Sequence, residues 1–242
     1  MKSLIYLLAA SILFFLNCTT MGAGGYSSYP SVYMNEEPLL AKSLFASDNA
    51  IISQAAIDTI LSSRIKIPEN SKVALIKFAG PTEHNSSTYG YGYWRSEAYL
   101  KLQQSYVDKL TSKIEHSSKI NSVSVLPSLL TPQSPTIPVL REASVRLQSP
   151  LLVIYRINSD IYEEYRVFRS NKSKAYATVE VVLLDVRTGI IPFTSIATRE
   201  YQSTKTKEDT NDRDLIRRTE QEAVNRALDK VAEELIHFLN TN

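Results

Sequence analysis

The stretch that decides the fold is residues 175–201, AYATVEVVLLDVRTGIIPFTSIATREY. Two runs rich in β-branched and aromatic residues flank the segment Asp185–Gly189, which ends in the residue type that tolerates a positive φ. Each run has one apolar face, formed by Ala177, Val179, Val181 and Leu183 in the first and by Ile191, Phe193 and Ala197 in the second. One apolar face opposite a mixed face is typical of an antiparallel hairpin that packs on a core from one side. The stretch therefore predicts the centre of a sheet, and it carries no chemistry of its own.

Segments on both sides of this hairpin predict an α+β fold. Before it, the sequence predicts strands over residues 73–78, 123–126, 151–155 and 161–168, and helices over residues 47–61 (with Ser47-Asp48 as N-cap), 96–116 and 139–147. After it, residues 212–239 predict a long amphipathic helix, in which apolar residues recur at spacings of three and four: Ile216, Ala223, Val224, Ala227, Leu228, Val231, Leu235 and Leu239. We therefore expect a mixed sheet in which βα units are followed by an antiparallel meander and a long C-terminal helix.

The composition fits one globular domain. Of the 242 residues, 43% are hydrophobic and 21% charged, with a formal net charge of +2. Such fractions are typical of a folded protein, and we assign residues 47–242 to a single domain. The basic segments 172–174 and 205–207 are short, so the sequence predicts no nucleic-acid partner.

The N-terminus, MKSLIYLLAASILFFLNC, is typical of a signal peptide. Lys2 precedes an apolar run from Leu4 to Leu16, which is too short to span a bilayer as a helix. The run leads to Cys18, the only cysteine of the chain, in a position that resembles the lipobox of bacterial lipoproteins, although Asn17 stands where that motif has a small residue. The resemblance implies a lipoprotein signal peptide over residues 1–18 and acylation of Cys18 with fatty acids such as palmitate. The alternatives are an ordinary secretory peptide and an uncleaved anchor.

Residues 19–46 predict a flexible tether, because Thr, Gly, Ser, Tyr and Pro dominate and no periodicity is sustained. A flexible segment of this length spans on the order of 30 Å. By the same lipoprotein resemblance, Thr19 directly after the cysteine implies sorting to the outer membrane. We expect the domain to face the periplasm.

Four features together resemble one superfamily of periplasmic lipoproteins: the lipobox, the strand VALIKF at residues 73–78, the turn DVRTG at residues 185–189, and the long closing helix. This superfamily includes the curli-secretion channel lipoprotein and the activator lipoprotein of penicillin-binding proteins, and its fold is similar to the N-terminal domain of TolB. The resemblance covers roughly residues 68–240 and implies the same α+β scaffold. One departure concerns the channel, which needs two membrane-spanning hairpins per subunit, whereas the sequence predicts a single hairpin of sufficient length.

Catalytic motifs are missing from the sequence. It has no Gly-x-Ser-x-Gly elbow, and the glycines of Gly90-Tyr91-Gly92 are too few for a phosphate-binding loop, with Arg95 at the place of the third glycine. His84, His116 and His237 are the only histidines, and the latter two lie near predicted helix C-termini, where the helix dipole favours a cation. Glu163 and Glu164 occupy adjacent strand positions on opposite faces, so they cannot form a carboxylate dyad. We predict no catalytic residue, metal or cofactor.

One loop is unusual in composition. Tyr89, Tyr91, Tyr93 and Trp94 lie within six residues, interleaved with glycines. Tyrosine and tryptophan are favoured at binding interfaces, so these four residues are a candidate partner-binding loop. The alternative is that the rings fold back and cover the core. The proline-rich segment Pro127–Pro138 must be irregular or the first turn of the next helix, and it is more often a spacer than a ligand.

The leading hypothesis from the sequence is a lipid-anchored, non-enzymatic envelope protein that binds an envelope protein or the cell-wall machinery. The first alternative is a subunit of an oligomeric curli-type secretion channel, and a periplasmic hydrolase is a more distant one. The oligomeric state and the identity of the partner stay open.

Overall fold

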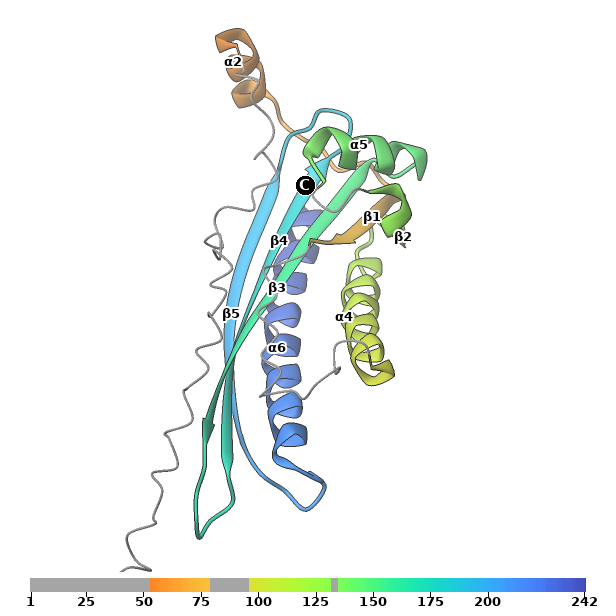
Figure 1. Ribbon diagram of the computed structural model, residues 1–242. Helices are drawn as coiled ribbons and strands as arrows, with labels where there is room; N and C mark the ends of the chain where they lie inside the picture. The colour runs from red at the N-terminus through yellow and green to blue at the C-terminus, as the bar shows by residue number, and fades with distance from the viewer. Residues whose placement is uncertain (1–52, 79–95, 132–134) are drawn as a thin grey trace, which may run out of the picture. The chain divides into compact units, whose positions relative to one another are not determined.

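The structure, a computed structural model, describes residues 53–78, 96–131 and 135–242. In this part the chain is an α+β protein, as predicted, with one five-stranded mixed sheet in the order β2-β1-β3-β4-β5 (Figure 1). The first helix of the described part, α2 (Gln54–Ser62), begins after the N-cap Ser53 and buries none of its side chains. The predicted cap Ser47-Asp48 lies outside the described residues.

The first half of the sheet is parallel. Strand β1 (Ser71–Lys77) pairs in parallel with both β2 (Ile120–Val125) and β3 (Leu151–Glu164). Helix α4 (Glu97–Glu115) connects β1 to β2, and α5 (Ile137–Arg146) connects β2 to β3 after a short 3-10 helix η3 (Ser128–Leu130). The predicted βα units are therefore confirmed, and Pro138 lies in the first turn of α5, one of the two places expected for it.

The second half of the sheet is an antiparallel meander of β3, β4 (Lys172–Asp185) and β5 (Phe193–Thr204). The sequence predicted separate strands over residues 151–155 and 161–168, and this was wrong, because β3 is one 14-residue strand that pairs with β4 along its whole length. The polar residues between the two predicted strands do not interrupt it: Asn158 and Asp160 lie on the face opposite the core, and Ser159 donates a hydrogen bond to Glu220 of the C-terminal helix at 2.5 Å. The chain thus has two consecutive long hairpins where the sequence predicted one.

The predicted turn between β4 and β5 is confirmed. Gly189 has a φ of 78°, and its N–H donates to the carbonyl oxygen of Asp185 at 2.8 Å. Ile191, expected on the same face as Phe193, packs with α5 instead, because it precedes the first residue of β5.

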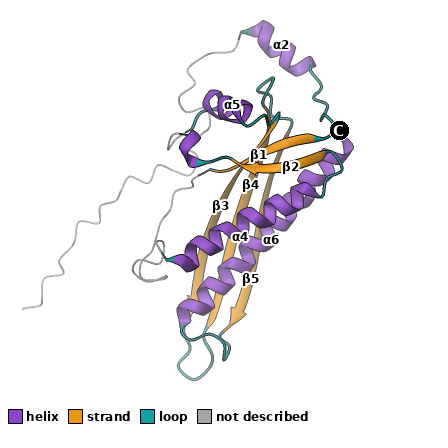
Figure 2. Ribbon diagram, turned by 90° about the vertical axis from the view of Figure 1, so that its right-hand side faces the viewer, coloured by secondary structure: helices purple, strands orange, loops and turns teal. Residues whose placement is uncertain are grey.

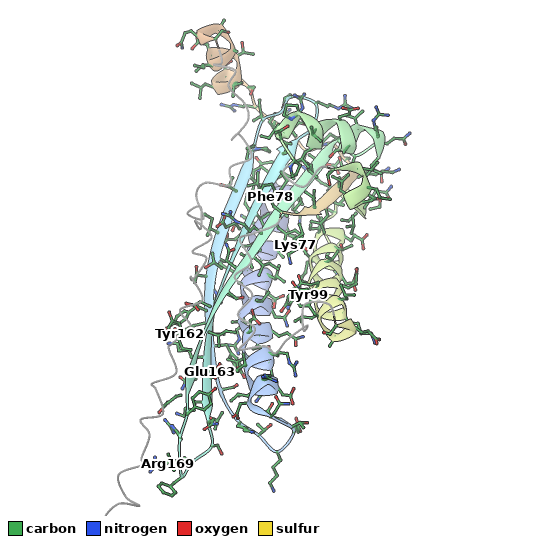
Figure 3. All side chains as sticks on the ribbon, in the orientation of Figure 1. Lys77, Phe78, Tyr99, Tyr162, Glu163 and Arg169 are labelled. Atoms are coloured by element: carbon green, nitrogen blue, oxygen red, sulfur yellow. The ribbon has the colours of Figure 1, made fainter. Side chains whose placement is uncertain are left out.

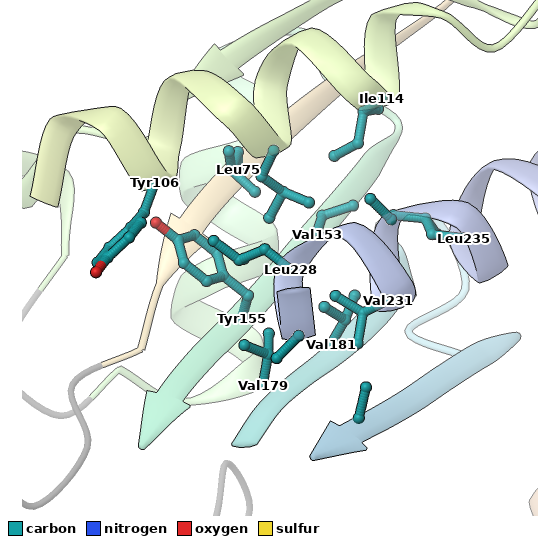
Figure 4. Packing of buried hydrophobic residues seen from close by; sticks show 14 of the residues in the cluster. Leu75, Tyr106, Ile114, Val153, Tyr155, Val179, Val181, Leu228, Val231 and Leu235 are labelled. Atoms are coloured by element: carbon teal, nitrogen blue, oxygen red, sulfur yellow. The ribbon is translucent and has the colours of Figure 1, made fainter. Parts of the chain in front are cut away.

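The long helix α6 (Asp212–Thr241) covers one face of the meander, the inner face. It begins with a capping box, in which Asn211 and Asp214 each accept the other's backbone N–H. All eight apolar residues predicted to form its buried stripe are buried. Seven of them pack with the alternate residues of β4 that the sequence assigned to the core, Ala177, Val179, Val181 and Leu183 (Figure 4). The eighth, Ile216, packs with Tyr99 and Ile161.

Helix α4 lies beside α6 on the same face and buries Tyr106, Leu110 and Ile114 in the same cluster (Figure 2). Lys109 of α4 forms an ion pair with Asp229 of α6 at 2.8 Å. Helix α5 covers a second, smaller cluster on the opposite, outer face, built on Ala74, Ile76, Leu152 and Ile154. The rest of the outer face, along the far parts of β3, β4 and β5, is covered by no described helix.

The loop between β5 and α6 is held by a buried carboxylate. Asp209 accepts hydrogen bonds from the backbone N–H and the hydroxyl of Thr206 at 2.7 and 3.1 Å. It also pairs with Arg218 of α6 at 2.8 Å, and this guanidinium is the main cause that lowers the pKa of Asp209 below its ordinary value of 3.8.

We expect Asp209→Asn to destabilise the domain by about 1–3 kcal/mol at neutral pH, because Arg218 loses its charged acceptor. The folded-state pKa is lowered, so the stabilisation is fully present above the ordinary value of 3.8 and is lost as the pH falls through the lower folded value. Urea unfolding of both proteins across this pH range measures the difference in unfolding free energy.

The matched control is Glu142→Gln, whose pair with Arg146 on α5 has both side chains about two-thirds exposed. It should change the stability by less than about 0.5 kcal/mol. An Asp209→Asn difference that persists undiminished at the lowest pH would contradict the assignment to the carboxylate.

Candidate functional site

Strand β5 leaves one of its two edges without a described partner. It pairs with β4 over all 12 residues without a register shift, and no described strand lies on its other side. Natural edge strands are usually blunted by a bulge, a proline or a row of charges. Residues 193–204 contain no proline and only two charged residues, Arg199 and Glu200. We refer to the unpaired side of residues 193–204 as the β5 edge.

No described strand bonds to the backbone groups of the β5 edge, although Arg218 donates to the carbonyl oxygen of Thr204 at 3.3 Å. Arg199 donates to the carbonyl oxygen of the neighbouring Thr198 at 2.9 Å, which is one local form of edge protection. On the outer face, Ile196 is 71% exposed although it is a large apolar residue in the middle of a strand. A single exposed isoleucine is normal on a protein surface, so the feature that distinguishes this edge is its row of backbone groups without a described strand partner.

A shallow groove of about 520 Å³ lies where α6 meets the first residue of β5. Its lining consists of Phe193 from β5 and one side of the last turns of α6: Lys230, Glu233, Glu234, His237, Phe238 and Thr241. The rings of Phe193 and Phe238 are 5.1 Å apart and form the apolar part of the lining. The groove therefore combines an aromatic floor with a charged rim directly beside the β5 edge.

Two charged groups of the groove, Lys230 and Glu234, are matched, whereas Glu233 forms no ion pair with a described residue. Glu234 accepts a hydrogen bond from Ser195 at 2.5 Å and forms an ion pair with Lys230 at 3.0 Å. Ser195 first, and then Lys230, lower the pKa of Glu234. The carboxylate is therefore ionised at neutral pH and is a weak base.

This arrangement does not favour nucleophilic catalysis. An activated serine needs a base that accepts its proton, such as a histidine that a third group orients. Here the hydroxyl of Ser195 is buried and donates to a carboxylate of lowered pKa. Across residues 53–78, 96–131 and 135–242, no three His, Cys, Asp or Glu side chains gather as metal ligands would.

On the exposed part of the outer face, polar side chains of neighbouring strands form pairs with each other. Arg156 and Glu180 form an ion pair at 2.6 Å, and the hydroxyls of Thr178 and Thr198 are 2.9 Å apart. Lys174 pairs with Glu200 at 2.9 Å, and this carboxylate raises the pKa of Lys174. Cross-strand pairs of this kind stabilise the sheet. On the same face, Asp160 forms no ion pair with a described residue and accepts a hydrogen bond from the backbone N–H of Ile161 at 2.9 Å.

The binding residues predicted from the sequence cannot be placed. Cys18 and the aromatic residues Tyr89, Tyr91, Tyr93 and Trp94 lie outside the described residues, and so does His84. Whether the aromatic loop binds a partner or covers the core stays a prediction.

His116, Glu163 and Glu164 lie at the positions that the sequence predicted for them. His116 is the C-cap of α4, and its Nδ1 lies 2.5 Å from the carbonyl oxygen of Ser112. Glu163 and Glu164 interact with different neighbours, since the hydroxyl of Tyr165 donates to Glu163 and Arg166 pairs with Glu164 at 2.7 Å. The two carboxylates do not form a dyad.

Sequence reasoning missed the groove, because its two rings are 45 positions apart, from Phe193 to Phe238, and only the packing of α6 on β5 brings them together. It assigned His237 to the helix dipole alone, whereas the structure also places this residue in the groove. None of the helices in the described part of the chain has the length and apolarity that a membrane crossing requires.

No family model matches this chain, and no curated protein matches it. Among solved structures, the hypothetical protein CT253 from Chlamydia trachomatis is similar over 72% of this chain and 99% of its own, with 12% identity and a TM-score of 0.44. A PelC dodecamer from Paraburkholderia phytofirmans is similar over 71% of this chain and 86% of its own (15% identity, TM-score 0.33). A minor lipoprotein from Acinetobacter baumannii is similar over 69% of this chain and 94% of its own (9% identity, TM-score 0.34).

Lipoproteins recur among these similar structures, including one from Neisseria meningitidis. At TM-scores this low, the likeness assigns neither a family nor a function to this chain. The resemblance to the curli-channel and penicillin-binding-protein-activator lipoproteins therefore stays a prediction from the sequence.

Proposed function

We propose that this chain is a lipid-anchored, non-enzymatic envelope protein whose domain binds an extended segment of a partner protein along the β5 edge. The observation that carries this proposal is a 12-residue strand without a bulge, whose second edge has no described strand partner and whose first residue lies beside the groove. Cys18 supplies the anchor.

The chemistry of the β5 edge selects the kind of partner. An unpaired strand offers a row of backbone N–H and C=O groups, and an extended polypeptide is the ligand that matches this spacing. Strand addition gains its affinity from these backbone hydrogen bonds and its specificity from pockets that take alternate side chains. The groove floored by Phe193 and Phe238 fits an apolar or aromatic side chain of the bound segment.

Charged side chains beside the β5 edge are paired with each other, so the charge of a partner should contribute little to its recognition. Glu234 and Lys230 pair with each other, and Arg226 pairs with Glu222 while it lies over the ring of Tyr201. Both signs of charge therefore line this side of α6, and no single sign of partner charge is favoured. We expect binding that depends weakly on salt.

The anchor follows from the sequence. Each acyl methylene contributes about 0.8 kcal/mol to membrane partitioning, and two or more chains give stable attachment. We place the anchor in the outer membrane and the domain in the periplasm, because Thr19 follows the cysteine. The tether then gives the domain a reach on the order of 30 Å from the bilayer.

The alternative of a secretion-channel subunit gains no support from the described strands. A membrane-spanning hairpin presents a continuous apolar side to lipid. The outer face of the meander carries the ion pairs Arg156–Glu180 and Lys174–Glu200, and its inner face is covered by α6.

We expect Cys18→Ser to abolish incorporation of labelled palmitate and to move the protein out of the outer-membrane fraction. The reason is that Cys18 is the only thiol of the chain and acylation needs it. Metabolic labelling followed by membrane fractionation measures both effects. Labelling that persists in Cys18→Ser would refute the lipoprotein assignment.

For the β5 edge, we expect a photo-crosslinking amino acid at Ile196 or Gln202 to form adducts with one protein in intact envelopes. Both side chains are exposed on β5, so neither substitution disturbs the core. Mass spectrometry of the adducts identifies the partner and the segment that is bound. Strand addition predicts a short contiguous peptide.

The control position is Val145, which is 61% exposed on α5 and lies away from β5. A second control combines the crosslinker at Gln202 with Thr198→Pro, which removes a backbone donor of β5 and should reduce the adducts at least tenfold. Equal adducts at Val145, or adducts spread over unrelated proteins, would contradict an edge-binding function.

A further inference from the structure

The loop that joins β3 to β4 carries two adjacent apolar residues at its tip, and both are almost fully exposed. Val167 is 90% exposed and Phe168 is 96% exposed, while Tyr165 beside them is 68% exposed. The loop is closed by its own hydrogen bond, in which the N–H of Arg166 donates to Oδ1 of Asn171 at 2.9 Å. The exposed pair is therefore held at the tip of an ordered turn, and we call residues 165–171 the apex.

The apex and the start of β4 are positively charged, because the four cations of residues 163–174 outnumber the two carboxylates Glu163 and Glu164. Residues 165–174 contain four cations, Arg166, Arg169, Lys172 and Lys174, and no acidic residue. Arg166 and Lys174 pair with strand carboxylates, Glu164 and Glu200. Arg169 and Lys172 form no ion pair with any described residue, and Figure 3 shows Arg169 at the far end of the hairpin.

The neighbouring loop between β5 and α6 adds little negative charge. It is tied to the apex, since the N–H of Lys205 donates to the carbonyl oxygen of Asn171 at 2.9 Å. Asp209 of this loop pairs with Arg218, and Asp212, the first residue of α6, pairs with Lys205. Among the acidic residues of 205–212, Glu208 alone forms no ion pair with a described residue. Lys207 of the same loop is likewise unpaired among the described residues.

The size of the apolar tip decides which partner it fits. A stable protein interface needs roughly 800 Å² from each partner, which two side chains at the end of a narrow hairpin cannot supply. Insertion into a lipid interface requires only a few apolar side chains, with cations at the level of the headgroups. Cations near anionic lipids each add to the attraction.

We propose that the apex inserts Val167 and Phe168 into an anionic phospholipid surface, with Arg169 and Lys172 at the phosphate level. This contact goes beyond the proposed function, because it involves neither acylation of Cys18 nor the β5 edge. It gives the domain a second attachment that fixes its orientation at a membrane.

The test uses the full chain with Cys18→Ser, in which Phe168→Cys creates the only thiol. A nitrobenzoxadiazole label on that thiol reports its own surroundings, whatever else holds the chain to a vesicle. On vesicles of phosphatidylethanolamine and phosphatidylglycerol, we expect its emission to shift to the blue and to be quenched by nitroxide-labelled lipid. Adding Arg169→Glu and Lys172→Glu should weaken this response about tenfold or more.

The matched control is the same label at Leu129→Cys in the Cys18→Ser chain, because Leu129 is also 96% exposed but belongs to η3. The emission of this label should stay at the wavelength that it has in water, and nitroxide-labelled lipid should not quench it. The proposal is overturned if the label at position 168 keeps its emission in water although the vesicles carry the protein. It is also overturned if the label at position 129 shows the same blue shift and quenching, or if vesicles without phosphatidylglycerol give the same response.

Discussion

The packing of α6 on the inner face of the meander is the interaction on which the rest of the structure depends. A helix of 30 residues is about 45 Å long, and strands of 14 residues are about 46 Å long. Because the two lengths match, the buried stripe from Leu215 to Leu239 covers the apolar rows of β3, β4 and β5 together. A single helix therefore completes the main core, with α4 filling the space beside it over β1.

This arrangement decides which surfaces stay open. The inner face is buried, and the outer face is covered by α5 at one end and by polar cross-strand pairs along the rest. Two of the surfaces that stay open are the edge of the last strand and the tip of the first hairpin. The proposed functions lie at these two places, where backbone groups and apolar side chains have no described partner within the fold.

The sequence predicted those parts of the fold that repeat along the chain. The periodicity of α6 and the alternation of β4 correctly assigned every core residue that they named, and Gly189 marked the turn between β4 and β5. The sequence failed at residues 156–160, where the polar side chains on the outer face and Ser159 on the inner face resembled a break in a strand. A strand is predicted from the regular recurrence of apolar residues on one face. One polar residue on that face therefore makes a continuous strand look like two separate strands.

The candidate site was much less predictable. Edges and grooves arise from the order of strands in the sheet, and that order depends on contacts between segments far apart in the chain. The sequence predicted that Phe168 ends a strand. Only the pairing of β3 with β4 shows that this residue lies in the turn between the two strands. The role proposed for Cys18 rests on the sequence alone, because the lipobox that it resembles is a local motif.

The central claim, that α6 completes the core and leaves the β5 edge unpaired, can be tested most directly by amide hydrogen exchange. With the full chain carrying Cys18→Ser, the account predicts slow exchange throughout β4 and in the buried turns of α6, and a period-two pattern in β5. Amides of β5 that donate to β4 should be protected, and the alternate ones that face the free edge should exchange rapidly. Uniform protection of β5, equal to that of β4, would mean that this edge is already paired and would contradict the account.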